Sequence, residues 1–307
     1  MDVFLQQLIN GLVSGSIYAI VALGYTLVYG ILRLINFAHG EIVMIGAMIA
    51  LTIIGLLGDS GLPGVAIIGL GLLGAIPCCM LIGYLIERIA YRPLRHAPSL
   101  TPLITAIGVS IVLQNLAMIV WGKEYVSFPP LIEMQYFPIA EASINNVQIF
   151  IVMVSTLMMV GLNYLVNNTK LGNAMRATSQ NAEVAGLMGV NVNTIISLTF
   201  VIGSALAAVA GIMVTAYYGL AHYDMGFMLG LKAFTAAVLG GIGNLRGAMF
   251  GGILLGIIES MGAGYLGTLT NGVFGSNYQD VFAFFTLIGV LIFKPSGLLG
   301  KAGSERP

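Results

Sequence analysis

The chain has 307 residues, of which 58% are hydrophobic and only 8% are charged, with 12 basic and 12 acidic side chains and no net charge. Soluble domains carry about 25% charged residues, so this composition argues against a soluble enzyme. An intrinsically disordered chain would combine low hydrophobicity with high charge, and a nucleic-acid-binding protein would show a basic face. The composition therefore predicts a protein that lies mostly in lipid.

Long runs without any Asp, Glu, Lys or Arg separate the charged residues. These runs are 3–32, 42–58, 60–86, 96–122, 142–169 and 184–223. A membrane-spanning helix needs about 20 mostly apolar residues, whereas outer-membrane strands would alternate over about 10 residues. The runs predict an all-α polytopic membrane protein with one transmembrane domain over residues 1–307 and eight to ten transmembrane or re-entrant helices.

Nine spans are expected in chain order. They are 5–31, 41–57, 63–86, 101–121, 147–166, 194–218, 227–243, 247–265 and 278–293. The pair 227–243 and 247–265 has a second interpretation as a re-entrant pair of half-helices, because Lys232 and Arg246 interrupt short apolar runs there.

Basic residues set the expected orientation, since cytoplasmic loops are enriched in Lys and Arg. They are Arg88, Arg92 and Arg95 with His96 in the loop 87–101, Lys170 and Arg176 in the segment 167–193, and Lys294, Lys301 and Arg306 in the tail. The segment 122–146 is acidic and is expected outside the cytoplasm. Nine crossings then place the N-terminus outside and the C-terminus inside.

The first polar island, Arg33–Glu41 (RLINFAHGE), lies between two long apolar runs. One interpretation is a cytoplasmic turn that caps the next helix, with Glu41 in its first turn. The other is a broken helix on a translocation path, because free N–H groups at a half-helix N-terminus suit a carboxylate. On the second interpretation Asn36, His39 and Glu41 line or gate the path, and Lys232 is a further candidate.

The segment 170–191 reads as one short amphipathic helix on the cytoplasmic face. An interfacial anchor would favour Lys and Arg with Trp or Phe, which this segment lacks, so docking into a partner groove is the better interpretation. The candidate contact residues are Arg176, Ala177, Asn181, Glu183, Ala185, Gly186 and Gly189.

Small residues recur at a spacing of four near the end of the chain. Such spacing lets helix backbones approach closely, and it occurs at Gly247 and Gly251, at Gly252 and Gly256, and at Ala207 and Gly211. The sequence therefore predicts tightly packed helices. Gly240, Gly241 and Gly243 predict a turn, a hinge or a re-entrant tip.

Catalytic and nucleotide-binding motifs are not visible in the sequence. There is no G-x-x-x-x-G-K-[ST] phosphate loop and no H-E-x-x-H metal motif, and both motifs bind their ligands through those residues. We therefore expect a protein that is not an enzyme and has no metal or cofactor of its own.

Three segments together resemble one family. Asn36–Glu41 (NFAHGE) followed by Met44–Ala47, the segment 170–191, and Lys232–Asn244 are similar to the permease subunit of branched-chain amino-acid ABC importers, in its shorter H-type form. The resemblance covers Gly11 to Gly300 and implies the fold of the ribose and vitamin B12 permeases.

The resemblance also implies a bacterial inner-membrane complex. Its partners would be a second homologous permease, two cytoplasmic ATPase subunits that bind the ATP, and an outer binding protein that delivers leucine, isoleucine or valine. The segment 170–191 would be the coupling segment, although Ala177-Thr-Ser stands where many importers have Glu-Ala-Ala. The alternatives are an importer permease for urea, short amides or other apolar amino acids, and a stand-alone channel.

Overall fold

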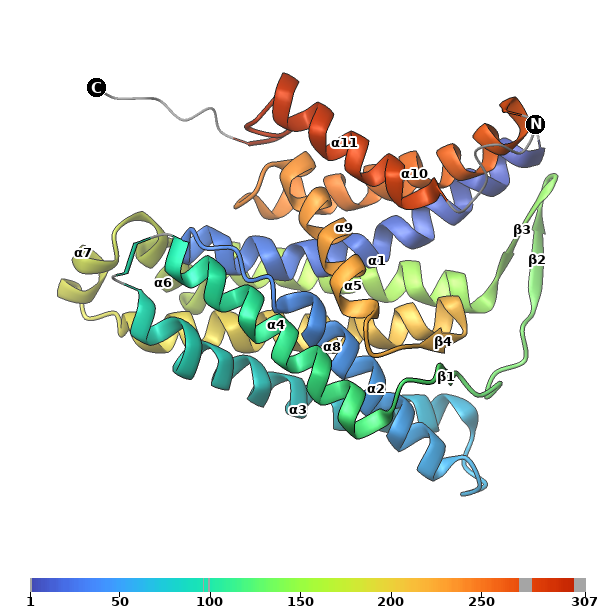
Figure 1. The fold of residues 1–307 in the computed structure, drawn as a ribbon, viewed down its shortest axis with the longest axis horizontal. Helices are drawn as coiled ribbons and strands as arrows, with labels where there is room; N and C mark the ends of the chain where they lie inside the picture. The colour runs from blue at the N-terminus through green and yellow to red at the C-terminus, as the bar shows by residue number, and fades with distance from the viewer. Residues whose placement is uncertain (1, 96, 99, 271–277, 301–307) are drawn as a thin grey trace. The chain divides into compact units, whose positions relative to one another are not determined.

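The computed structural model describes residues 2–95, 97–98, 100–270 and 278–300, so His96, Lys301 and Arg306 lie outside the described residues. The helices are α1 Asp2–Leu32, α2 His39–Leu57, α3 Gly64–Leu85, α4 Leu100–Trp121, α5 Asn146–Asn168, α6 Lys170–Gln180, α7 Ala182–Leu187, α8 Val192–Tyr218, α9 Met225–Gly240, α10 Leu245–Leu269 and α11 Gln279–Phe293 (Figure 1). A π-helical turn, Ile86–Tyr91, and a 3₁₀ turn, Arg92–Leu94, continue α3. The short strands are β1 Val126–Ser127, β2 Tyr136–Ile139, β3 Ala142–Asn145 and β4 Leu220–Ala221.

The helical membrane architecture predicted from the apolar runs is confirmed. Seven helices of the described residues, α1, α2, α3 with its continuation, α4, α5, α8 and α10, are long and apolar enough to cross a bilayer. The predicted spans 227–243 and 278–293 correspond to the shorter α9 and α11, of 16 and 15 residues. At 1.5 Å per residue, α9 is about 24 Å long, which is shorter than a typical hydrocarbon core of about 30 Å. It ends early because Gly241 and Gly243 take positive φ angles of 107° and 89°.

The chain divides into two compact units, and their boundaries fall inside α1, α5 and α9 and between β1 and β2. Unit 1 comprises Met1–Thr26, Met134–Val160 and Leu231–Pro307, and unit 2 comprises Leu27–Glu133 and Gly161–Gly230. Each unit is described by itself below.

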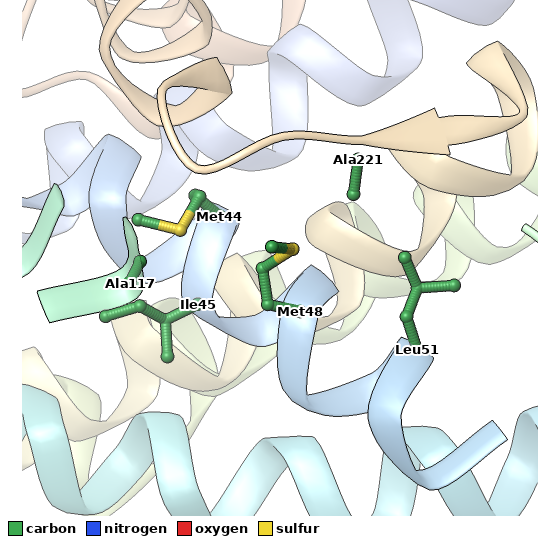
Figure 2. Close-up of a cluster of buried hydrophobic side chains, with 6 residues drawn as sticks. All are labelled: Met44, Ile45, Met48, Leu51, Ala117 and Ala221. Atoms are coloured by element: carbon green, nitrogen blue, oxygen red, sulfur yellow. The ribbon is translucent and has the colours of Figure 1, made fainter. Parts of the chain in front are cut away.

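In unit 2, α2 is the central helix and packs against α3, α8 and α4. It is apolar on every side, as expected for a helix that other helices surround. Figure 2 shows an apolar cluster of Met44, Ile45, Met48 and Leu51 from α2 with Ala117 of α4 and Ala221 of β4. The α2–α8 contact is close, since a Cβ added at Gly211 would lie 2.3 Å from the Val43 carbonyl oxygen. Only glycine fits there, as the small-residue spacing predicted.

In unit 1, the glycines of α10 lie on two faces that pack against different helices. A Cβ at Gly256 would lie 2.3 Å from the Gly15 nitrogen of α1, and one at Gly252 would lie 2.4 Å from the Ala19 Cα. On the other face, a Cβ at Gly251 would lie 2.1 Å from the Ala236 carbonyl oxygen of α9. The predicted close packing of the last third of the chain is therefore confirmed.

We expect Gly256→Ala to lower the free energy of unfolding by about 1–3 kcal/mol, the usual cost of overpacking. The added methyl group would meet the α1 backbone, which cannot move aside as a flexible side chain can. The measurement is the thermal unfolding midpoint of the detergent-purified protein. The control is Gly108→Ala in α4, where nothing lies within 4 Å of an added Cβ. Equal midpoints for the two variants would contradict the close α1–α10 contact.

Hydrogen bonds bring together loops that the nine-crossing topology places on the same side. In unit 2, β1 pairs antiparallel with β4, and Arg95 Nη1 donates to Asn193 Oδ1 over 2.6 Å. In unit 1, Gln6 Nε2 donates to the Ser143 carbonyl oxygen over 3.2 Å, and Asn244 Nδ2 donates to the Leu299 carbonyl oxygen over 2.7 Å. The order of crossings predicted from the sequence agrees with these pairings.

Candidate functional site

A partly buried, non-helical stretch joins α1 to α2 in unit 2. Arg33 ends α1 with a left-handed φ of 53°, which a non-glycine residue rarely adopts. Asn36 is buried, and its Oδ1 lies 3.1 Å from the Tyr91 hydroxyl group. The Asn36 carbonyl oxygen accepts from the His39 backbone N–H over 3.0 Å. The stretch is thus held in place rather than exposed as a simple surface turn.

The first turn of α2 meets the first turn of α9 within unit 2. A Cβ added at Gly40 would lie 2.3 Å from the Gly226 carbonyl oxygen and 2.9 Å from the Gly230 Cα. The backbones therefore touch with no side chain between them. His39 and Glu41, in the same first turn of α2, are both 1% exposed.

Glu41 carries the most unusual group of this site. Its Oε1 accepts a hydrogen bond from Ser110 Oγ of α4 over 3.0 Å, while its Oε2 is buried and has no hydrogen-bond partner. A Cβ at Gly226 would lie 2.5 Å from that Oε2, so the oxygen faces the start of α9. The N-cap residue of α2, Ala38, offers no side-chain cap. A buried carboxylate oxygen and an uncapped helix N-terminus thus lie within one turn, and together they can bind opposite charges.

Lys232 lies in unit 1, inside a cluster of charges contributed by neighbouring helices. Its Nζ lies 2.5 Å from Glu259 Oε1 of α10 and 2.5 Å from Asp280 Oδ1 at the start of α11. It also lies 3.4 Å from the Tyr18 hydroxyl group of α1. The Glu259 side chain is fully buried, whereas Asp280 is half exposed. The ammonium group thus holds three helices to α9.

The segment 170–191 is not the single helix that the sequence predicted. It consists of α6 and α7, which Asn181 separates because it takes an extended conformation and its Oδ1 accepts from Val184 N–H over 3.0 Å. Asn is a strong N-cap residue. Asn181 therefore begins a new helix instead of continuing α6. At the other end Gly189, with a φ of 88°, closes the segment after α7.

The predicted contact residues of the coupling segment differ in exposure. Asn181, Glu183, Gly186 and Gly189 are exposed, Arg176 and Ala177 are half-buried, and Ala185 is buried. Arg176 donates to the Val166 carbonyl oxygen and to Asn173 Oδ1, so it fixes α6 to the end of α5.

Sequence reasoning missed the most prominent surface of this segment. Leu187 is 83% exposed and Met188 is 81% exposed, and Val184 is half exposed beside them. Apolar side chains at i, i+3 and i+4 were the available signal, since they share one face of a helix. An exposed apolar patch in an otherwise polar segment indicates a protein contact.

A second missed feature is Glu87, which is fully buried at the end of the third span. It pairs with Arg92 over 3.0 Å and with Arg95, and Ser197 Oγ donates to it over 2.6 Å. This cluster ties the chain after α3 to the start of α8, which follows the coupling segment. The available signal was a single acid next to three arginines.

Comparisons with known proteins place the chain among permeases. The profile described as "Branched-chain amino acid transport system / permease component" matches residues 7–291. The high-affinity branched-chain amino acid transport system permease protein BraD of Pseudomonas aeruginosa is 48% identical over 99% of this chain and 98% of its own length. LivH of Escherichia coli K12, whose name describes the same kind of permease, is 44% identical over 99% of this chain and 97% of its own length. A probable branched-chain amino acid transport permease of Methanocaldococcus jannaschii is 28% identical over 95% of this chain and 91% of its own length.

Proposed function

The chain belongs to the branched-chain amino acid transport permease family, and from this premise we propose that it is the membrane-spanning subunit of an ATP-driven importer of leucine, isoleucine or valine. The observation that carries the proposal is the site where the first turns of α2 and α9 meet, with Glu41 buried beside the uncapped start of α2. Helix N-termini that meet between spans form binding sites for charged solutes in other transporters. The surrounding apolar side chains suit an apolar amino acid.

Asn36, His39 and Glu41 line or gate the path in this proposal. Asn36 keeps the chain before α2 non-helical through Tyr91, and Glu41 supplies the charge. Lys232 is a further candidate for the path, and within unit 1 it pairs with Glu259 and Asp280. Charged groups within spans are rare, and they mark transport paths when they occur.

ATP hydrolysis belongs to partner subunits in this account, because the chain carries no phosphate-loop motif. Two cytoplasmic ATPases would engage the segment α6–α7 through Asn181, Glu183, Gly186 and Gly189 together with Leu187 and Met188. A second homologous permease would complete the path, and an outer binding protein would deliver the substrate. Arg176, Ala177 and Ala185 would hold the segment in position rather than contact the ATPase, because they are less exposed.

We place the protein in the bacterial inner membrane as one permease domain, with the N-terminus outside and the C-terminus in the cytoplasm. The basic residues at the loops beside α3 and α6 and in the tail support this orientation. The same-side pairings of Arg95 with Asn193 and of Asn244 with Leu299 support the order of crossings.

The experiment is uptake of radiolabelled leucine by cells from which the gene for this chain is deleted. We expect energy-dependent uptake at micromolar leucine to fall at least tenfold and to return on complementation. Loss of urea or acetamide uptake, with leucine uptake unchanged, would favour the small-solute alternative. Purification of the chain without any ATPase subunit would favour a stand-alone channel.

A further inference from the structure

We infer that Glu41, with Ser110 and the first turn of α9, binds the ammonium group of the transported amino acid. This inference rests on the proposed function and deepens it, because it assigns one charged group of the substrate to one side chain of the path.

The Glu41 carboxylate is costly to bury in its present surroundings. Glu41 is 1% exposed, and its Oε2 has no hydrogen-bond partner. Among the residues that the structure describes, no Lys or Arg forms an ion pair with it, and its one hydrogen-bond donor is the neutral Ser110 hydroxyl group. Burying a charge without a partner is strongly unfavourable. If the site binds a cation during the transport cycle, that cation would be the missing partner of Glu41 Oε2.

The unpaired oxygen of Glu41 points toward the start of α9. Oε2 faces Gly226, at the place where α9 begins, and Gly40 and Gly226 touch through backbone atoms alone. Met225, also in the first turn of α9, packs against the apolar cluster of α2, so a displacement of this turn from α2 would move Met225 and open the oxygen to a ligand. Asp224, two residues before Gly226, carries a second carboxyl group near the start of α9, and it pairs with His222.

The site matches the charge pair of an α-amino acid. Ammonium and carboxylate sit on one carbon atom, so a receptor must offer a negative and a positive group close together. The first turn of α2 offers both, because Glu41 supplies the anion and the N-terminus supplies the positive end of the helix dipole. No side chain caps this N-terminus, and its first N–H, that of His39, already bonds to the Asn36 carbonyl oxygen. Urea and short amides lack this charge pair, so the same geometry disfavours them.

The test compares Glu41→Gln, Glu41→Asp and wild type in proteoliposomes that contain the whole importer, with leucine-loaded binding protein and ATP. Glutamine keeps the size and the hydrogen bond to Ser110 but removes the charge. We expect Glu41→Gln to lower leucine uptake at least tenfold, while ATP hydrolysis stimulated by the binding protein stays within twofold of wild type. We expect Glu41→Asp to keep more uptake than Glu41→Gln. Glu124→Gln, the same change at an exposed position, is the matched control and should transport normally.

Two results would overturn the inference. One is leucine uptake by Glu41→Gln within twofold of wild type. The other is parallel loss of uptake, stimulated hydrolysis and thermal stability in Glu41→Gln and Glu41→Asp alike, which would assign Glu41 a structural role. Failure of the proposed function would look different, because wild type itself would then import no leucine, or would import urea or acetamide instead.

Discussion

Replacing Lys232 with methionine is expected to lower the free energy of unfolding by about 3–5 kcal/mol, the cost of leaving a buried charge without its partner. Lys232 Nζ is the group that neutralises Glu259, whose side chain is fully buried, and it lies 2.5 Å from that carboxylate. Methionine has a similar size and keeps the packing, so the loss of stability reports the removal of the Lys232 charge alone. The thermal unfolding midpoint of the purified protein measures the effect.

The double variant Lys232→Met/Glu259→Met provides the decisive comparison. Replacing both members of a buried ion pair by apolar residues is often nearly neutral, so the double variant should recover most of the lost stability. Asp280 remains, but it is half exposed. The surface control, Lys123→Met, should leave the midpoint unchanged. A single Lys232→Met variant as stable as wild type would contradict the charge cluster.

The double variant also separates the two roles assigned to Lys232. If it is stable yet fails to import leucine, then Lys232 or Glu259 acts in the path. If it is stable and imports normally, then the cluster only holds α1, α10 and α11 to α9. The second outcome would remove Lys232 from the path and leave Asn36, His39 and Glu41 as its candidates.

The second large effect concerns coupling to the ATPases. Replacing both Leu187 and Met188 with serine should reduce ATP hydrolysis stimulated by the loaded binding protein at least tenfold, with leucine uptake lost in parallel. The two side chains are more than four-fifths exposed, and exposed apolar side chains carry most of the energy of a helix-in-groove contact. The substitution removes that contact without touching the interior of the permease.

Two measurements accompany this prediction. Co-purification of the ATPase subunits should fall with hydrolysis, while the thermal midpoint of the permease alone should stay the same. Gln180→Ser, a change at an exposed polar position of the same segment, is the control and should keep full activity. Normal stimulated hydrolysis in the Leu187→Ser/Met188→Ser variant would move the ATPase contact to another part of the cytoplasmic face.

The helices could be predicted from the sequence because lipid imposes a simple rule. A span must satisfy its own backbone and carry few charges, so runs without charge mark the spans directly. The rule failed in detail where local chemistry competed with it. Gly241 and Gly243 ended α9 before it reached full length, and the side chain of Asn181 divided the coupling segment into α6 and α7.

The contacts of the site could not be predicted, because they join residues far apart in the chain. Ser110 reaches Glu41 across 69 positions, and Tyr91 reaches Asn36 across 55. Lys232 was identified as an isolated charge, but its neutralisation by Glu259, 27 positions later, depends on how α9 and α10 pack. The single charges in apolar runs were visible in the sequence, but only the fold supplies their partners.

The most direct test of the central claim is uptake of radiolabelled leucine into proteoliposomes that contain this chain with its partner permease and ATPases. We expect leucine uptake against its concentration gradient. This uptake should require ATP, the loaded binding protein and this chain. Leucine that equilibrates without ATP, or a complex that imports urea or acetamide but no branched-chain amino acid, would contradict it.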